Sequence, residues 1–384
     1  MTDSAPGVLL SAGTVLTPEG ALDGGWLRVS GTRIAEVRAG QPPTKPDVAF
    51  PGGILVPGFV DTHVHGGGGG SFSTTDPRSA VTAARFHLAH GTTSVVASLV
   101  SAPAPELARQ ADTLADLAQD GVVAGIHLEG PWLSPQFKGA HDESCLGLPD
   151  PASVARLMAA GRGFVRMVTL APELDDAPQA LQRIVDSGAA VAVGHTAADY
   201  DITRRAIDAG ATVATHLFNA MPALHHREPG PALALLEDPR VTVELIGDGV
   251  HLHPRVAAWA MRCAAGGFSL VTDAISAAGQ PDGRYRLGGL AVEVSEGTAT
   301  LAGSAIIAGS TLTMHRALVR AVHGGLSLPD AVVACSTRPA QVLGLGDVGR
   351  LEPGRLADVV VLDRDLGVQR VMRHGQWITP AGHP

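Results

Sequence analysis

Residues 58–70 read GFVDTHVHGGGGG and join a short apolar segment to two histidines and a run of glycines. Phe59 and Val60 are typical of a buried strand, and His63 and His65 stand at its end. Seven more apolar runs of strand length follow along the chain, most of them ending in a polar or ionisable residue. They cover residues 93–99, 123–129, 164–171, 189–195, 212–216, 241–248 and 268–273.

Helical patterns separate most of these runs, for example AVTAARFHLAH (80–90) and DITRRAIDA (201–209). Eight buried strands that alternate with helices predict an α/β fold, a TIM-like (β/α)8 barrel, over residues 58–344. A twisted open sheet is the alternative arrangement. Residues 283–303 read as a β-rich insertion after the eighth strand.

The two ends of the chain differ from this middle part. Residues 1–57 contain strand patterns punctuated by glycine and proline, and residues 345–384 contain the strand patterns ADVVVLD and VQRVMRHGQWI. We expect the two ends to form one small β-sandwich domain beside the barrel.

The charge and the cysteines limit the range of partners. A net charge of −9 argues against nucleic acid or an anionic membrane as a partner, although a local Arg and His pocket can still bind a small anion. The three cysteines form no CxxC motif, and the N-terminus lacks a basic segment followed by a long apolar one. We therefore expect a cytoplasmic protein.

Imidazole and carboxylate groups stand at the ends of several predicted strands. These residues are His63, His65, Glu129, His195, His216 and Asp273. A lone buried histidine is most often a hydrogen-bonded core residue, but the strand ends of a barrel surround one mouth, where active sites form. Together these groups suit Zn²⁺ or a similar first-row ion, which can ionise water near neutral pH.

Several longer motifs occur in an order that resembles the N-acetylglucosamine-6-phosphate deacetylase family of the amidohydrolase superfamily. They are PGFVDTHVHGG, HLEGPWLSPQFKGAH, VAVGHTAADY, THLFNAMPALHHREPG, IGDGVHLHP, VTDAISAAG and AGSTLTM. The resemblance implies hydrolysis of the acetamide of N-acetyl-D-glucosamine 6-phosphate to D-glucosamine 6-phosphate and acetate, in amino-sugar salvage. The 4-epimer, N-acetylgalactosamine 6-phosphate, remains an alternative substrate, and a metal-free scaffold protein on the same fold is a remote alternative.

The resemblance also implies which residues bind the metal and which residue transfers protons. Glu129, His195 and His216 would hold the principal divalent ion, and His63 and His65 would join Glu129 around a second one. Zn²⁺ is the expected ion, with Fe, Mn and Co as alternatives, and the choice between one ion and two stays open. Asp273 would act first as general base and then as general acid.

Substrate contacts follow from the same resemblance. His141 would polarise the acetyl carbonyl or bind a sugar hydroxyl, with Ala140 beside it. Asn219 and Ala220 would hold the phosphate, and His251 would contact the sugar or the phosphate. Arg227 would reach the phosphate bound to the neighbouring subunit of a homodimer; the plain alternative is a solvent-facing ion pair. Met314 would pack against the acetyl group or the sugar face.

Overall fold

The computed structural model describes residues 7–378, so residues 1–6 and 379–384 of the predicted terminal domain lie outside the described residues. Its central sheet has eight strands in the order β14-β13-β12-β11-β10-β9-β8-β5. The bounds are β5 (Phe59–Val64), β8 (Thr92–Leu99), β9 (Gly125–Glu129), β10 (Val165–Leu170), β11 (Ala190–Val193), β12 (Ala211–Ala214), β13 (Thr242–Ile246) and β14 (Phe268–Val271). Neighbouring strands pair in parallel.

The first and last strands of this sheet meet at a seam. The backbone N–H of Asp273 donates to the carbonyl of His63 at 2.8 Å. Thr272 Oγ1 donates to the buried carboxyl of Asp61 at 2.6 Å. These bonds join the end of β14 to β5 and nearly close the sheet, so the predicted barrel is confirmed and the open sheet is excluded.

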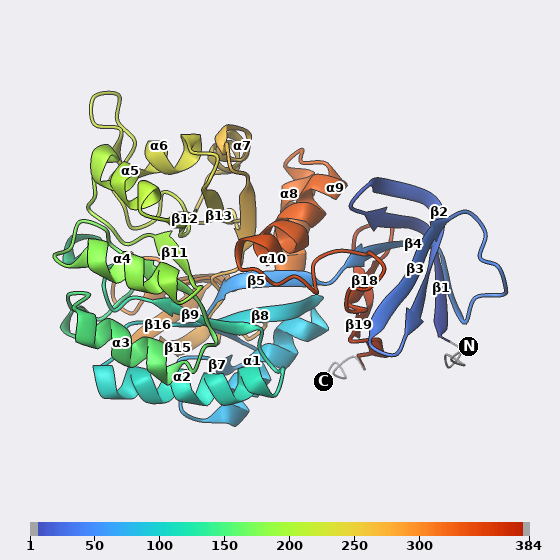
Figure 1. Ribbon diagram of the computed structural model, residues 1–384, viewed down its shortest axis with the longest axis horizontal. Coiled ribbons are helices and arrows are strands. Elements are labelled where there is room, and N and C mark those ends of the chain that lie inside the picture. Colours follow the sequence, from blue (N-terminus) through green and yellow to red (C-terminus); the bar gives the residue numbers. More distant parts are fainter. Residues whose placement is uncertain (1–6, 379–384) are drawn as a thin grey trace.

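Helices cover the outside of the barrel (Figure 1). They are α1 (Pro77–Ala89), α2 (Ala104–Gln119), α3 (Pro151–Ala160), α4 (Ala177–Asp186), α5 (Tyr200–Asp208), α6 (Gly230–Glu237), α7 (Pro254–Cys263), α8 (Met314–His323), α9 (Leu328–Val332) and α10 (Arg338–Val342). Helix α4, for example, buries an apolar stripe that contains Ala180, Leu181 and Ile184. The strands β5, β8, β9 and β13 are buried along their whole length, as expected of parallel strands under helices.

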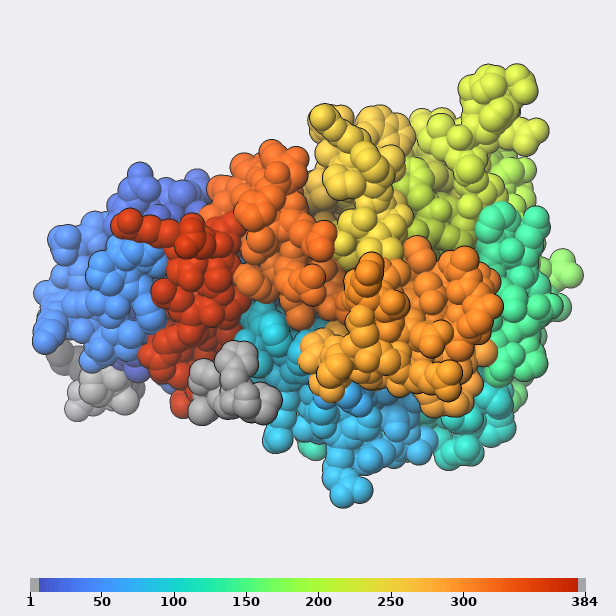
Figure 2. Space-filling view, turned by 180° about the vertical axis from the view of Figure 1, so that it is seen from behind, coloured from blue at the N-terminus to red at the C-terminus, as the bar shows by residue number. Residues whose placement is uncertain are grey.

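A second sheet draws its strands from both ends of the chain and lies beside the barrel (Figure 2). Its seven strands follow the order β20-β19-β18-β4-β1-β2-β3. They are β1 (Val8–Thr17), β2 (Gly20–Ser30), β3 (Arg33–Ala39), β4 (Val48–Pro57), β18 (Val359–Leu362), β19 (Val368–Arg373) and β20 (Gln376–Trp377). Val56 in β4 pairs with Val360 in β18, which confirms that the two ends form one β-rich unit. The predicted boundaries at 57/58 and 344/345 stay predictions.

Smaller elements complete the barrel mouth. Strands β15 (Gly283–Leu287), β16 (Leu290–Ser295) and β17 (Thr298–Leu301) form a three-stranded sheet after β14. The strand pair β6 (Gly66–Gly67) and β7 (Gly70–Ser71) follows His65, and a Cβ atom on Gly66 would lie 2.4 Å from the Gly70 carbonyl oxygen, so glycine is required there. Within residues 7–378, no helix has both the length and the apolar character to cross a bilayer.

Candidate metal centre and active site

The carboxylate of Glu129, at the end of β9, is the centre of a cluster of histidines. Glu129 Oε1 lies 3.1 Å from His195 Nε2 and 3.2 Å from His216 Nε2. On its other side, His63 Nε2 lies 3.3 Å from Oε1 and His65 Nε2 lies 3.1 Å from Oε2. All five residues are at least nine-tenths buried. The structure therefore brings together the five residues that the sequence analysis named as metal ligands.

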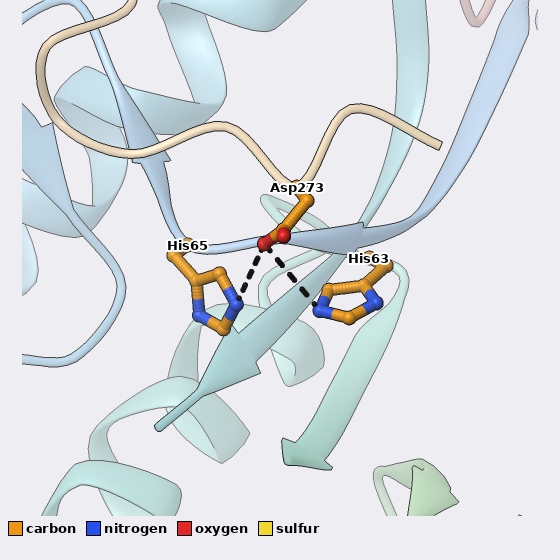
Figure 3. Close-up of side chains that lie close together, drawn as sticks. All are labelled: His63, His65 and Asp273. Atoms are coloured by element: carbon orange, nitrogen blue, oxygen red, sulfur yellow. Dashed lines mark ion pairs between the residues drawn. The ribbon is translucent and has the colours of Figure 1, made fainter. Parts of the chain in front are cut away.

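Asp273 joins this cluster from the seam of the barrel. Figure 3 shows its carboxylate between the two rings of the His-X-His pair. Asp273 Oδ1 lies 3.2 Å from His65 Nε2 and 3.6 Å from His63 Nε2. Potential ligand atoms of His63, His65 and Asp273 lie within 4.8 Å of one another, as do those of Glu129, His141 and His195.

Three of these side chains depend on an uncommon backbone conformation. His195, His216 and Asp273 follow the ends of β11, β12 and β14 with φ values of 48°, 28° and 49°. Positive φ is rare for residues other than glycine, and such conformations cluster at functional sites because the surrounding fold must maintain them. Here they occur together at one barrel mouth, which supports a functional centre.

The hydrogen bonds of the histidines decide which ring nitrogens have a free lone pair. His195 Nδ1 lies 3.0 Å from the Phe137 carbonyl and His65 Nδ1 lies 3.2 Å from the Ser98 carbonyl. Because a carbonyl oxygen only accepts, each Nδ1 carries a hydrogen, so in the neutral ring it is Nε2 that presents a lone pair to the cluster.

The converging lone pairs fit a cation better than a hydrogen-bond network. His195 Nε2 and His216 Nε2 lie only 3.0 Å apart, and with its hydrogen on Nδ1 the neutral His195 ring cannot donate across that gap. His216 Nδ1 has no hydrogen-bond partner among the described residues, so the His216 tautomer is free to leave its Nε2 lone pair for a cation. His63 Nε2 is buried and has no hydrogen-bond partner among the described residues. Imidazole nitrogens fixed through their other nitrogen are typical of metal ligands. The donor set therefore fits a divalent metal.

His141 differs from these histidines. The backbone N–H of Ser101 donates to His141 Nδ1 at 3.3 Å, and Ser101 Oγ lies 2.9 Å from the same nitrogen. With Nδ1 accepting, the neutral ring carries its hydrogen on Nε2, which lies 3.4 Å from Glu129 Oε2. Burial lowers the pKa of His141 to about 4, which keeps the ring neutral. His141 is thus prepared to donate a hydrogen bond rather than to bind a metal.

The carboxylates stay ionised in spite of their burial. Burial alone would raise the pKa of Asp273, but with no metal bound the protonated rings of His63 and His65 and a hydrogen bond from His65 lower it to about 2. Burial likewise opposes ionisation of Glu129, and the surrounding imidazoles hold its pKa well below the usual range. Two anionic groups beside imidazoles form a site at which a metal cation competes with protons.

A cavity of about 280 Å³ opens beside the cluster. Five of the predicted substrate contacts are among the residues that line it: Ala140, His141, Asn219, Ala220 and His251. His251 is fixed by Asp248, whose Oδ2 lies 2.7 Å from His251 Nδ1. An apolar wall faces these residues and includes Leu287 of β15 and Ile306 and Ile307 after β17.

Two predicted substrate contacts lie away from this cavity. Arg227 is exposed in the loop between β12 and α6, which protrudes from the molecule (Figure 1), and its Nη1 lies 2.8 Å from His226 Nε2. Met314 begins α8 and is fully buried. Neither residue lines the cavity of this single chain, so their substrate roles stay predictions.

Sequence reasoning missed several residues that support the cluster. Ser98 and Ser101 hold His65 and His141, and Glu244 holds His63 through Nδ1 at 3.1 Å. Glu244 had a signal in the sequence, because it is the one ionisable residue inside the apolar run VTVELI (241–246). The serines had none, since serine is common at strand ends.

Comparison with known proteins agrees with this geometry. Residues 54–378 match the family described as Amidohydrolase family. The N-acetylgalactosamine-6-phosphate deacetylase of Escherichia coli O157:H7 is 37% identical over 374 residues, 96% of this chain and 98% of that protein. The human N-acetylglucosamine-6-phosphate deacetylase is 39% identical over 347 residues, 86% of this chain and 84% of that protein.

The solved structures include a similar protein from Mycobacterium smegmatis. It is a mutant N-acetyl-D-glucosamine-6-phosphate deacetylase in complex with N-acetyl-D-glucosamine-6-phosphate, 49% identical, with a TM-score of 0.95 over 97% of this chain and 99% of that chain. The N-acetylglucosamine-6-phosphate deacetylase of Thermotoga maritima is 30% identical, with a TM-score of 0.87 over 98% of this chain and 99% of that chain. With the barrel and the histidine and carboxylate cluster, these matches show that the chain belongs to the amidohydrolase family, in the group that contains the amino-sugar-phosphate deacetylases.

Proposed function

We propose that this protein hydrolyses the acetamide of N-acetyl-D-glucosamine 6-phosphate to D-glucosamine 6-phosphate and acetate, as a step in amino-sugar salvage. The observation that carries the proposal is the convergence of Glu129, His195 and His216 beside Asp273 at the barrel mouth. The similar Mycobacterium smegmatis structure contains this sugar phosphate, which supports the choice of substrate.

The proposal includes a divalent metal held by Glu129, His195 and His216. When bound, such an ion polarises a carbonyl and makes water more acidic, which is the chemistry that amide hydrolysis needs. Zn²⁺ is our first choice because the site offers imidazoles and a carboxylate; Fe, Mn and Co are the alternatives. His63 and His65, together with Glu129, form the candidate site for a second ion.

The residues of the chain supply the proton transfers. The ionised Asp273 accepts a proton from the attacking water and returns it to the departing nitrogen. The N–H at Nε2 of His141 is suited to donate to the carbonyl oxygen as negative charge develops on it, and Ser101 keeps the ring in that tautomer. The proposed base and the proposed donor face the same cavity.

Substrate binding follows from the lining of the cavity. Asn219 and Ala220 supply polar groups for the phosphate, His251 faces the sugar or the phosphate, and Ala140 lies beside His141. The apolar wall around Leu287 leaves room for the sugar or acetyl group but offers it no charge. Met314, at the start of α8, is proposed to pack against the acetyl group or the sugar face.

Arg227 is proposed to act in a homodimer, where it reaches the phosphate bound to the neighbouring subunit. Its exposed place in a protruding loop supports this role, because the side chain is available to a second subunit. The proposal also assigns the enzyme to the cytoplasm, supported by three free cysteines, Cys145, Cys263 and Cys335.

Arg227→Ala is expected to lower kcat/KM for N-acetyl-D-glucosamine 6-phosphate about 10- to 100-fold. This is the loss of a charge-assisted hydrogen bond, worth about 1.5–3 kcal/mol. The unphosphorylated sugar should lose almost nothing, so steady-state kinetics with both sugars test the assignment. Equal losses for the two sugars would show that Arg227 does not recognise phosphate. Leu224→Ala, at an exposed position of the same loop, controls for disturbance of the loop.

The alternative substrate is N-acetylgalactosamine 6-phosphate, which differs only at C4. The Escherichia coli relative named for that activity is 37% identical over 96% of this chain, which keeps the alternative open. We expect kcat/KM to be higher for the glucose epimer when acetate release is measured with each substrate. A preference for the galactose epimer would replace the proposed substrate, and no acetate from either would reject the proposed reaction.

A further inference from the structure

Glu244 is a buried carboxylate inside the barrel that the proposed reaction does not use. It lies in the middle of β13, where its side chain is 2% exposed, between Val243 and Leu245. Thr62 Oγ1 donates to its Oε1 at 2.9 Å, and its Oε2 lies 3.1 Å from His63 Nδ1. Burying a carboxylate is costly unless its oxygens are satisfied, so a contribution to the neighbouring site is the natural explanation.

The contact with Glu244 dictates the tautomer of His63. A carboxylate oxygen accepts, so His63 Nδ1 carries the hydrogen and Nε2 keeps its lone pair. That lone pair faces the cluster, 3.3 Å from Glu129 Oε1 and 3.6 Å from Asp273 Oδ1. The opposite tautomer would leave Glu244 Oε2 without a donor in an apolar strand.

Glu244 gives His63 a partner that the other histidines of the cluster lack. His65 and His195 are fixed by backbone carbonyls, those of Ser98 and Phe137. A carboxylate is a stronger acceptor than a carbonyl, and it makes the opposite ring nitrogen a better ligand. Of these three rings, only His63 is held by a side chain that a substitution can remove.

We propose that Glu244 is a positioning residue that orients His63 and strengthens it as a ligand for the second divalent ion. The inference rests on the metal site proposed above. Glu244 comes from β13 and His63 from β5, with β14 between them at the seam, so the contact also ties the His-X-His pair to a strand that β5 does not pair with. The ion held by Glu129, His195 and His216 does not depend on this contact.

Zn²⁺ titration of the metal-stripped protein, with metal content measured after dialysis, tests the proposal. The unchanged chain should bind two ions. Glu244→Leu should weaken the second ion about 10- to 100-fold, the usual cost of losing such a partner, and leave the first unchanged. Glu244→Gln keeps an oxygen acceptor for His63 Nδ1, so its loss should be smaller. Thr62→Val, which removes only the other hydrogen bond of Glu244, is the matched control.

The possible outcomes separate this inference from the proposed function. If Glu244→Leu binds both ions as tightly as the unchanged chain does, the positioning role is overturned. It is also overturned if the unchanged chain binds only one ion. If Glu244→Leu does not fold, an affinity loss in Glu244→Gln no larger than that in Thr62→Val would also overturn it. Acetate release by the unchanged chain is measured separately, so an inactive protein that binds two ions would reject the substrate and not the role of Glu244.

Discussion

Asp273→Asn is expected to lower kcat for N-acetyl-D-glucosamine 6-phosphate about 10²- to 10⁴-fold, the usual contribution of a general acid–base group. The carboxylate is ionised beside His63 and His65, so its oxygens carry no proton before the reaction begins. Asparagine has nearly the same shape but cannot take up and return that proton. Stopped or continuous assays of acetate release measure the loss.

Metal content distinguishes loss of the base from loss of the site. We expect Asp273→Asn to retain the ion held by Glu129, His195 and His216, because none of these depends on Asp273 for its hydrogen bonds. Asp248→Asn is a matched control, since Asp248 contacts His251 and not the cluster, and its effect should fall mainly on KM. Full turnover in Asp273→Asn would reject it as the base.

The barrel could be predicted from the sequence because its strands are buried on both faces. Runs such as TSVVASL (93–99) contain no charged residue, and helical patterns between them leave a parallel sheet with covering helices as the simplest arrangement. The sequence predicted that the two β-rich ends form one domain, but it did not predict that β4 pairs with β18. The register between strands so distant in sequence depends on packing that no local pattern encodes.

The metal cluster was predictable for a related reason. Residues at the carboxyl ends of parallel strands share one mouth, so Glu129 and His195 meet although 66 positions separate them. The supporting hydrogen bonds were not predictable, because the Phe137 carbonyl that fixes His195 belongs to the backbone, at the end of a short 3-10 helix (Pro135–Phe137). No residue type marks such a contact, and only the folded chain brings it into place.

The motif that contains Met314 predicts a helix start but not the surroundings of that side chain. The motif AGSTLTM lies near the site in the chain, but the direction of a side chain depends on where a helix begins. Thr313 caps α8 by accepting from the backbone N–H of Arg316, which places Met314 in the first turn, and there its side chain is fully buried.

His195→Ala is expected to lower the affinity for the principal ion by more than about 100-fold. Loss of a residue that is only hydrogen-bonded to a metal ligand usually costs about 10- to 100-fold, and His195 is proposed to be a ligand itself. His195 Nε2 faces Glu129 Oε1 at 3.1 Å while Nδ1 is fixed by Phe137, so alanine removes a preorganised donor that water replaces poorly. Elemental analysis after dialysis, with Zn²⁺ titration, measures the loss, and turnover should fall with occupancy.

A second buried histidine provides the control for this substitution. His87 lies on α1 and contacts the Gly66 carbonyl at 2.9 Å, outside the cluster, so His87→Ala can lower stability but should leave the metal content of the folded protein unchanged. Unchanged occupancy in His195→Ala would mean that this ring is not a ligand. If the purified, unchanged chain binds no divalent metal at all, the proposed metal-dependent reaction is rejected. That result would favour the metal-free scaffold protein.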